Sequence, residues 1–169
     1  YNEKDKPIKL KKYSDSVNKL AKKLKCKIIF EPGRSIIGDT GILLSKIQYI
    51  KKGAKKDFII IDAGMNDFMR PALYDAVHKI IPIRKSKSKL KGTIEFVGPI
   101  CESTCKFGSY KNYQKISEND FVAITNVGAY GSSLSSNYNS RPLIAELLVN
   151  KNKIKHIRKK QDLLKLINS

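Results

Sequence analysis

The sequence predicts a mainly β protein, in which part of an α/β domain is followed by a largely antiparallel β domain. Two observations predict the first part: residues 13–25 place apolar side chains at helical spacing, and residues 27–30 follow as a β-branched, apolar strand. A third observation predicts the β domain, because short apolar runs alternate with turn signals from about residue 36 onward. The 169 residues suffice for one domain and part of a second.

Each expected element has its own sequence signal. The first helix has one apolar face, formed by Val17, Leu20, Ala21 and Leu24. Ser14 or Asp15 is expected to cap its N-terminus, because either side chain can accept a hydrogen bond from a free backbone N–H group. Strands are expected at residues 41–49, 57–62, 92–97, 120–127, 144–149 and 153–158. Short helices are expected after Arg70-Pro71, since proline fits the first helical turn, and at residues 161–167.

The composition indicates a folded protein without a membrane segment. Hydrophobic residues make up 41% of the chain and charged residues 29%, which is enough apolar content for a core. The apolar runs, such as residues 58–61 and 80–83, are far shorter than the roughly 18 residues of a membrane span. Residues 1–25 contain lysines throughout and no apolar stretch typical of a secretory signal. We therefore expect a cytoplasmic protein with no membrane partner.

The net charge leaves a nucleic-acid-binding protein open, whereas the cysteine content argues against a disulfide scaffold and a zinc module. The net charge of +19 raises nucleic acid as a partner, but the lysines are spread over the whole sequence, so a nucleic-acid partner is the less favoured interpretation. The three cysteines and two histidines lack the spacing of a disulfide scaffold or zinc module, and no metal is expected. The chain begins at Tyr1 and its methionines are Met65 and Met69, so we expect a fragment.

The first motif with chemical potential is Glu31-Pro32-Gly33-Arg34, directly after an apolar strand. In β/α architectures, ligands bind at the C-terminal ends of strands. Gly33 allows the backbone to approach a phosphate, Glu31 offers a carboxylate, and Arg34 offers a bidentate fork for an anion. A solvated Pro-Gly turn is the alternative.

Two further motifs combine reactive and charged residues. Arg70 and Tyr74 are four residues apart, so on a helix they would project from one face and could hold one anionic group together. The alternative makes Tyr74 a core aromatic residue and Arg70 a surface or capping charge. Cys101 and Glu102 place a thiol beside a carboxylate after a strand, although a single cysteine is more often a small buried residue.

The last motif is Gly128-Ala129-Tyr130-Gly131, which is followed by residues 137–142 with the sequence NYNSRP. Glycines on both sides of an aromatic residue indicate close approach of the backbone, either to a ligand or to another segment. No internal repeat or low-complexity linker interrupts the order of these motifs.

The motifs EPGR, DAGMND with RPALYDA, GPICES, and GAYG with SNYNSRP, in this order, resemble the diaminopimelate decarboxylase family. These are pyridoxal-phosphate enzymes of the alanine-racemase-like, ornithine-decarboxylase-like fold group. The resemblance implies that residues 1–35 are the last helix and strand of a β/α (TIM) barrel that binds the cofactor. It implies that residues 36–169 form a C-terminal β domain resembling a β-barrel or β-sandwich. It also implies a homodimer with shared active sites, where the Cys-Glu loop of one subunit reaches the other's site.

The resemblance implies a carboxy-lyase of lysine biosynthesis, which converts meso-2,6-diaminopimelate to L-lysine and CO2 with pyridoxal 5'-phosphate as cofactor. The residues implied to bind the cofactor are Glu31, Pro32, Gly33, Arg34 and Tyr130. The residues implied to bind the substrate are Arg34, Arg70, Tyr74, Glu102 and Tyr130. A clamp on the departing carboxylate would slow its loss, so the arginines belong at the substrate's distal carboxylate and Glu102 at the distal ammonium.

Cys101 matches the family's proton donor to Cα, a role that requires the thiol form. Thr104-Cys105 stands where the family usually has Gly-Asp, so the loop bearing Cys101 can differ from the family's. The lysine that binds the cofactor covalently belongs to upstream barrel strands, so the chain alone is expected to be inactive and to need that portion. An inactive remnant is the main alternative, and a basic nucleic-acid-binding protein is a weaker one.

Overall fold

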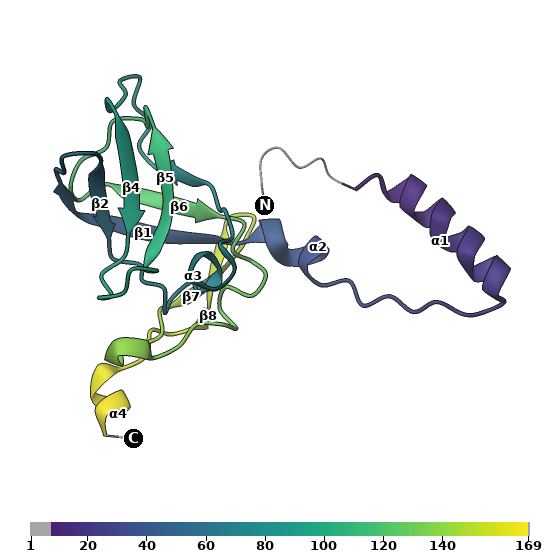
Figure 1. Cartoon of the computed structure of the whole chain (residues 1–169). Helices are drawn as coiled ribbons and strands as arrows, with labels where there is room; N and C mark the ends of the chain where they lie inside the picture. Colours follow the sequence, from purple (N-terminus) through teal and green to yellow (C-terminus); the bar gives the residue numbers. More distant parts are fainter. Residues whose placement is uncertain (1–7, 169) are drawn as a thin grey trace.

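A computed structural model of the chain describes residues 8–168 (Figure 1). Its helices are α1 (Leu10–Leu24), α2 (Arg34–Ile37), α3 (Arg70–Tyr74) and α4 (Leu163–Ile167), with 3-10 turns η1 (Gly38–Thr40) and η2 (Tyr138–Ser140). The strands are β1 (Ile42–Lys51), β2 (Asp57–Ile61), β3 (Ile80–Pro82), β4 (Thr93–Val97), β5 (Lys106–Lys111), β6 (Phe121–Thr125), β7 (Glu146–Asn150) and β8 (Lys153–Arg158). The six strands expected from the sequence are confirmed to within a few residues.

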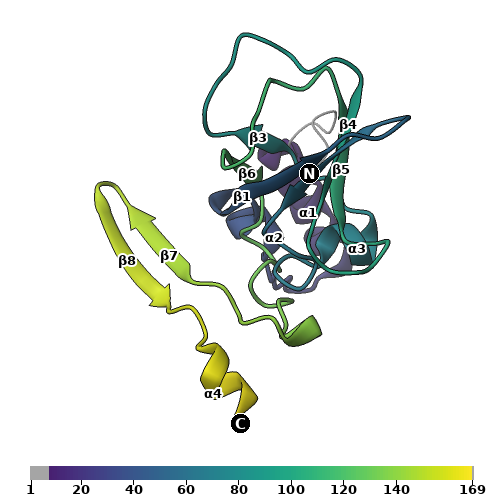
Figure 2. The same ribbon diagram turned by 90° about the vertical axis from the view of Figure 1, so that its left-hand side faces the viewer.

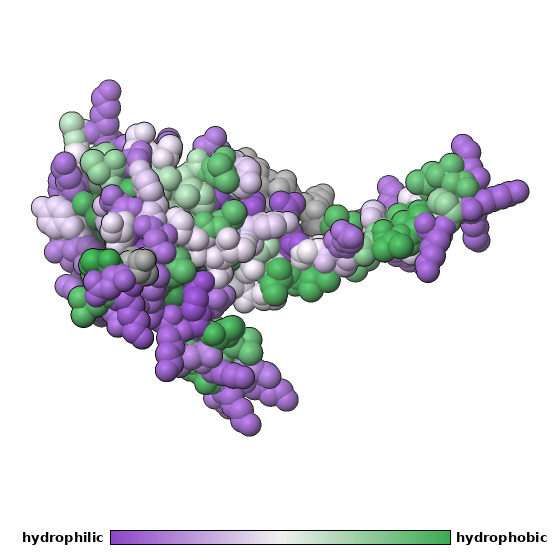
Figure 3. Space-filling model, turned by 90° about the horizontal axis from the view of Figure 1, so that it is seen from below, coloured by the Kyte–Doolittle hydropathy of each residue, from purple (hydrophilic) through white to green (hydrophobic). Residues whose placement is uncertain are grey.

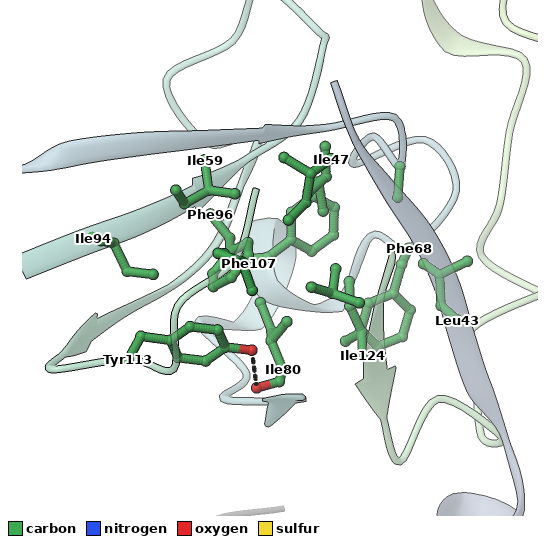
Figure 4. Close-up of a cluster of buried hydrophobic side chains, with 14 residues drawn as sticks. Leu43, Ile47, Ile59, Phe68, Ile80, Ile94, Phe96, Phe107, Tyr113 and Ile124 are labelled. Atoms are coloured by element: carbon green, nitrogen blue, oxygen red, sulfur yellow. Dashed lines mark hydrogen bonds between the residues drawn. The ribbon is translucent and has the colours of Figure 1, made fainter. Parts of the chain in front are cut away.

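One six-stranded sheet forms the body of the protein, in the order β3-β6-β1-β2-β4-β5. All neighbouring pairs are antiparallel except β2 and β4, which run parallel. The sheet curls around a core whose members include Ile47, Ile59, Phe68 and Phe96, each at most 1% exposed (Figure 4). The predicted mainly β, largely antiparallel domain is therefore confirmed as a curled half-barrel.

Two tyrosines connect the two ends of the curled sheet. Tyr110 on β5 accepts a hydrogen bond from the backbone N–H of Ile80 at 2.8 Å and lies 3.2 Å from the carbonyl oxygen of His78. Tyr113 donates a hydrogen bond to the carbonyl oxygen of Ile80 at 2.9 Å (Figure 4). Because β3 and β5 are the outermost strands of the sheet, these side chains close the curl where no backbone ladder does.

The hairpin of β7 and β8 forms a separate two-stranded sheet, and Figure 2 shows it beside the body together with α4. Arg158 donates from Nε to the carbonyl oxygen of Ile144 at 3.2 Å, and Ser132 Oγ lies 3.1 Å from Glu146 Oε2. These contacts attach the base of the hairpin to the chain that leads into it. Asp162 caps α4 by accepting a hydrogen bond from the backbone N–H of Leu164.

Helix α1 is confirmed, but its predicted cap is wrong. The helix begins at Leu10, and Lys9 occupies the N-cap position with no side-chain capping bond. The reason is that Leu10 continues the apolar spacing one turn before the expected start, which leaves Ser14 and Asp15 inside the helix. Helix α1 projects away from the sheet (Figure 1), and its apolar face is visible on the surface in Figure 3.

The predicted strand at residues 27–30 is wrong for the described part of the chain. Within residues 8–168 no segment pairs with it, and Ile29 and Phe30 are 79% and 51% exposed. An apolar segment becomes a strand only where a neighbour satisfies its backbone groups. The structure therefore describes the expected barrel segment, residues 1–35, only from Ile8 onward. Residues 1–7 lie outside the described residues. No helix in the described part is long and apolar enough to cross a bilayer.

Candidate active site

The loops after β2 and β4 lie side by side because these two strands are parallel, so their C-terminal ends meet at one edge of the sheet. The contact between the loops is direct. The backbone N–H of Met65 donates to Cys105 Sγ at 3.4 Å, and a Cβ atom at Gly98 would lie 2.6 Å from the carbonyl oxygen of Ala63. The second and third sequence motifs therefore adjoin each other.

Arg141 ties the fourth motif to the same place. Its guanidinium donates from Nε to Asn66 Oδ1 at 3.1 Å and from Nη2 to the carbonyl oxygen of Asp62 at 2.7 Å. The backbone of Ser136 donates to the carbonyl oxygen of Asn66 at 2.9 Å. These bonds join residues 62–67 to residues 136–141. Sequence reasoning assigned no role to Arg141 or Asn66, although both lie inside quoted motifs.

Asp67 completes this polar cluster. Its Oδ2 accepts from the backbone N–H of Gly64 at 2.8 Å and lies 3.5 Å from the Arg141 guanidinium. Burial raises the pKa of Asp67, and the hydrogen bonds from Gly64 and Arg141 oppose that rise. A buried carboxylate held this way fixes the turn after β2. In the sequence, the polar pair Asn66-Asp67 between apolar segments is the pattern from which this turn could have been predicted.

Arg70 and Tyr74 come together with Tyr130. Arg70 begins α3 and is only 8% exposed, and its guanidinium carbon lies 5.5 Å from the Tyr74 ring centre and 5.3 Å from that of Tyr130. Tyr74 is 60% exposed. The alternative expectation is thus wrong on both counts, because the arginine is buried and Tyr74 is not in the core. Both distances lie in the range of a cation–π contact between the guanidinium and an aromatic ring.

Tyr130 has a left-handed backbone, with φ of 63°, and stands half exposed above the buried Ala129. The neighbouring Gly128 donates from its backbone N–H to the carbonyl oxygen of Gly38 at 3.1 Å. A Cβ atom at Gly128 would lie 2.0 Å from the carbonyl oxygen of Ile37. Of the two explanations for glycine here, close approach to another segment is therefore the one that the structure supports, and that segment is α2 with η1.

The first motif, Glu31-Pro32-Gly33-Arg34, leads directly into α2, which makes this contact. Gly33 is the N-cap of α2, and its carbonyl oxygen accepts from the backbone N–H of Ile36 at 2.9 Å. Glu31, Pro32, Gly33 and Arg34 are all exposed, and nothing in the described chain lies within 4 Å of a Cβ atom built at Gly33. The structure thus leaves open space at Gly33, where the sequence predicts close approach to a ligand.

Cys101 and Glu102 lie exposed in the loop between β4 and β5. Glu102 Oε1 accepts a hydrogen bond from the hydroxyl of Tyr138, a partner that sequence reasoning missed. This hydrogen bond and the charge of Glu102 raise the pKa of Tyr138. The alternative of a buried Cys101 is wrong.

The buried cysteine is Cys105, at 3% exposed. A Cβ atom at Gly98 would lie 2.5 Å from its Sγ atom, so the two residues pack closely. Thr104 Oγ1 lies 3.7 Å from Met65 Sδ. The pair that replaces Gly-Asp therefore fixes the end of this loop against residues 63–65 and leaves Cys101 and Glu102 exposed.

The residues present suit a phosphorylated, aromatic cofactor. Arg34 and Tyr130 offer a cation and an exposed phenol, the backbone at Gly33 is open, and Glu31 offers a carboxylate. Within residues 8–168 no cluster of three or more histidine, cysteine or acidic side chains could hold a metal ion. A cation, a phenol and a free backbone suit an anion, and a carboxylate suits an amine or a protonated ring nitrogen.

The fold that carries these residues is a curled β domain in which the loops after β2 and β4 meet, with Cys101 and Glu102 exposed on the second loop. Residues 13–128 match the family described as pyridoxal-dependent decarboxylase, C-terminal sheet domain, and the chain belongs to this family.

The chain is similar to diaminopimelate decarboxylases in sequence and structure. It is 41% identical to that of Aquifex aeolicus over 96% of this chain and 38% of the relative, and 44% identical to that of Helicobacter pylori over 95% and 40%. The crystal structure of the Helicobacter pylori enzyme complexed with L-lysine superposes with a TM-score of 0.86 at 42% identity, over 98% of this chain and 41% of the other. The chain therefore spans about two fifths of the length of these relatives.

Proposed function

We propose that this chain is the C-terminal part of a diaminopimelate decarboxylase that releases CO2 from meso-2,6-diaminopimelate and forms L-lysine. The observation that supports this most is the contact of the Arg70 guanidinium with both Tyr74 and Tyr130, which joins two motifs of the family at one site. The whole enzyme would be a cytoplasmic homodimer with shared active sites. Residues 1–35 would belong to the barrel and residues 36–169 to the β domain.

The cofactor would be held by residues around α2 and Tyr130. Glu31 would lie beside the cofactor's ring nitrogen and keep it protonated. Gly33 and Pro32 would shape the backbone that receives the phosphate, and Tyr130 and Arg34 would bind its oxygens. When bound, pyridoxal phosphate would take up the electron pair that remains on Cα after the bond to the carboxylate breaks.

The substrate's distal end would be held by the clustered residues. The Arg70 guanidinium, with Arg34 and Tyr74, would bind the distal carboxylate. The burial of Arg70 strengthens such a contact, because a shielded charge is screened less by water. Glu102 would accept from the distal ammonium, and Tyr130 would contact both substrate and cofactor. Binding at the distal end leaves the reacting carboxylate free to depart.

Cys101 would complete the reaction by protonating Cα. Its exposed position in the β4–β5 loop suits a group that must reach a substrate bound elsewhere, including the site of a second subunit. The thiol hydrogen would move to Cα, and solvent would return a proton to sulfur. The lysine that holds the cofactor would come from the upstream barrel, so activity requires that portion.

The test joins this chain to the barrel portion of the Aquifex aeolicus decarboxylase and measures cofactor absorbance and CO2 release from meso-diaminopimelate. We expect the fusion to be active and the chain alone to be inactive. Replacement Cys101→Ala should lower kcat by roughly a hundredfold or more, whereas Cys26→Ala, at an exposed cysteine outside the motifs, should not. A folded fusion that binds the cofactor but releases no CO2 would refute the proposal and favour the inactive remnant.

A further inference from the structure

A turn of unusual backbone geometry lies directly beside the Cys-Glu loop. In η2, Asn139 and Ser140 both have a left-handed backbone, with φ of 60° and 55°. Asparagine tolerates this conformation but serine does so rarely, and consecutive residues of this kind persist only where the surroundings fix them. Holding Tyr138 in such a turn therefore costs free energy, which other contacts of the fold must offset.

The surroundings fix this turn from both sides. Ser136 and Arg141 are bonded to residues 62–67 through Asn66. The side-chain amide of Asn137 donates to the carbonyl oxygen of Arg141 at 2.9 Å and also bonds to Gln161 Oε1. The turn is thus anchored before and after Tyr138, while Tyr138 itself is 46% exposed.

Among the hydrogen bonds of the described residues, the side chain of Tyr138 makes one, from its hydroxyl to Glu102, while its backbone N–H donates to Ser136 Oγ. We infer that Tyr138 is a positioning residue: its hydroxyl holds one carboxylate oxygen of Glu102, so that the other oxygen faces the substrate's distal ammonium group. This inference rests on the proposed function, because it assigns Glu102 to the substrate.

The physical reason is that Glu102 is exposed on a loop and has three side-chain torsions to restrict. A carboxylate bound to a fixed phenol is already oriented before the substrate arrives, so less entropy is lost on binding. The contact belongs to the distal end of the substrate, away from the breaking bond. Its loss should therefore weaken binding of ground state and transition state alike, which raises KM and leaves kcat nearly unchanged.

Tyr138→Phe in the barrel-fused enzyme tests this prediction. We expect KM for meso-diaminopimelate to rise about tenfold, as for loss of a hydrogen bond to a charged group, with kcat within about twofold of the parent. Tyr49→Phe, at an exposed tyrosine on β1, is the matched control and should leave both constants unchanged. In a Glu102→Gln background, Tyr138→Phe should have a much smaller effect on KM, because the two residues act together.

A second readout needs no activity. In the unfused chain, the phenol of Tyr138, identified by the signal lost in Tyr138→Phe, should ionise above the ordinary range of a tyrosine, because its hydrogen bond to Glu102 raises its pKa. Glu102→Gln should return it toward the ordinary range. If Glu102→Gln raises KM while Tyr138→Phe does not, or if the Tyr138 titration ignores Glu102, the inference is wrong and the proposed function stands. If Glu102→Gln has no effect on the active fusion, the role of Glu102 in the proposed function fails, and the inference fails with it.

Discussion

The Arg70 guanidinium lies 5.3 Å from the ring centre of Tyr130, although the two residues belong to different motifs on opposite sides of β4 and β5 in the sequence. Tyr74 covers the guanidinium from the next turn of α3 at 5.5 Å. This arrangement fixes the direction of the guanidinium, and the proposed recognition of the distal carboxylate depends on it.

Replacement Arg70→Lys should impair substrate binding in the fused enzyme. Lysine keeps the charge but lacks the planar guanidinium, whose carbon lies within 5.5 Å of both ring centres and which can bind a carboxylate through two N–H groups. We expect kcat/KM for meso-diaminopimelate to fall by roughly ten- to a hundredfold, measured by CO2 release. The control is Arg84→Lys, at an exposed loop arginine, which should change little. Parent-like kinetics for Arg70→Lys would contradict the assignment.

Replacement Gly128→Ala should destabilise the contact between α2 and the Tyr130 segment. The added Cβ atom would lie 2.0 Å from the backbone oxygen of Ile37, so the backbone itself would have to move. We expect the free energy of unfolding to fall by about 1–3 kcal/mol in urea titrations. Gly33→Ala has nothing within 4 Å and is the control for loss of a glycine. Equal unfolding curves for the two variants would show that this contact is absent in solution.

Replacement Tyr113→Phe should weaken the closure of the half-barrel. The variant keeps the ring, which packs 5.3 Å from that of Phe96, but leaves the Ile80 carbonyl oxygen without the hydroxyl. The free energy of unfolding should fall by about 1 kcal/mol. Tyr49→Phe should be neutral, since Tyr49 is exposed. A stability of Tyr113→Phe equal to that of the parent would rule out a role of this bond in closing the sheet.

The buried His78 should make stability depend on pH. Its ring packs edge-on against Phe68, and burial, with a smaller contribution from the Arg70 charge, lowers the pKa of His78 below 6.5. The hydrogen bond between its Nδ1 and the Thr125 carbonyl oxygen, 3.0 Å apart, opposes this lowering without reversing it. Below the ordinary value of 6.5 the unfolded chain takes up a proton that the folded chain does not, so the free energy of unfolding falls as pH falls.

We expect urea midpoints of the parent to drop between about pH 7 and pH 5.5 by more than those of His78→Asn, which lacks the titrating group. His156→Asn, at an exposed histidine on β8, should follow the parent. A parent and a His78→Asn variant with the same pH dependence would contradict the lowered pKa.

The sequence predicted the fold best where a strand alternates clearly or ends at a turn signal, as in β1 and β8. It missed β3, which has only three residues and ends in Pro82, and β5, where Gly108 and Ser109 interrupt the apolar pattern. Both are edge strands, whose form depends on the neighbour they join. The strand expected at residues 27–30 does not form in the described part of the chain, because an apolar pattern alone does not supply a neighbouring strand to pair with.

The candidate site was predictable only where its residues are close in sequence. The spacing of Arg70 and Tyr74 indicated their contact, and Cys101 and Glu102 are adjacent. The bonds from Tyr138 to Glu102 and from Arg141 to Asn66 join residues far apart in the chain, so they depend on the parallel pairing of β2 with β4. No local pattern encodes that pairing.

The central claim is that these loops complete a decarboxylase, and product analysis of the barrel-fused enzyme tests it most directly. The account predicts that meso-diaminopimelate yields L-lysine and CO2 in equal amounts, and that the chain and the barrel portion, each alone, yield neither. A folded, cofactor-loaded fusion that produces neither L-lysine nor CO2 would contradict it.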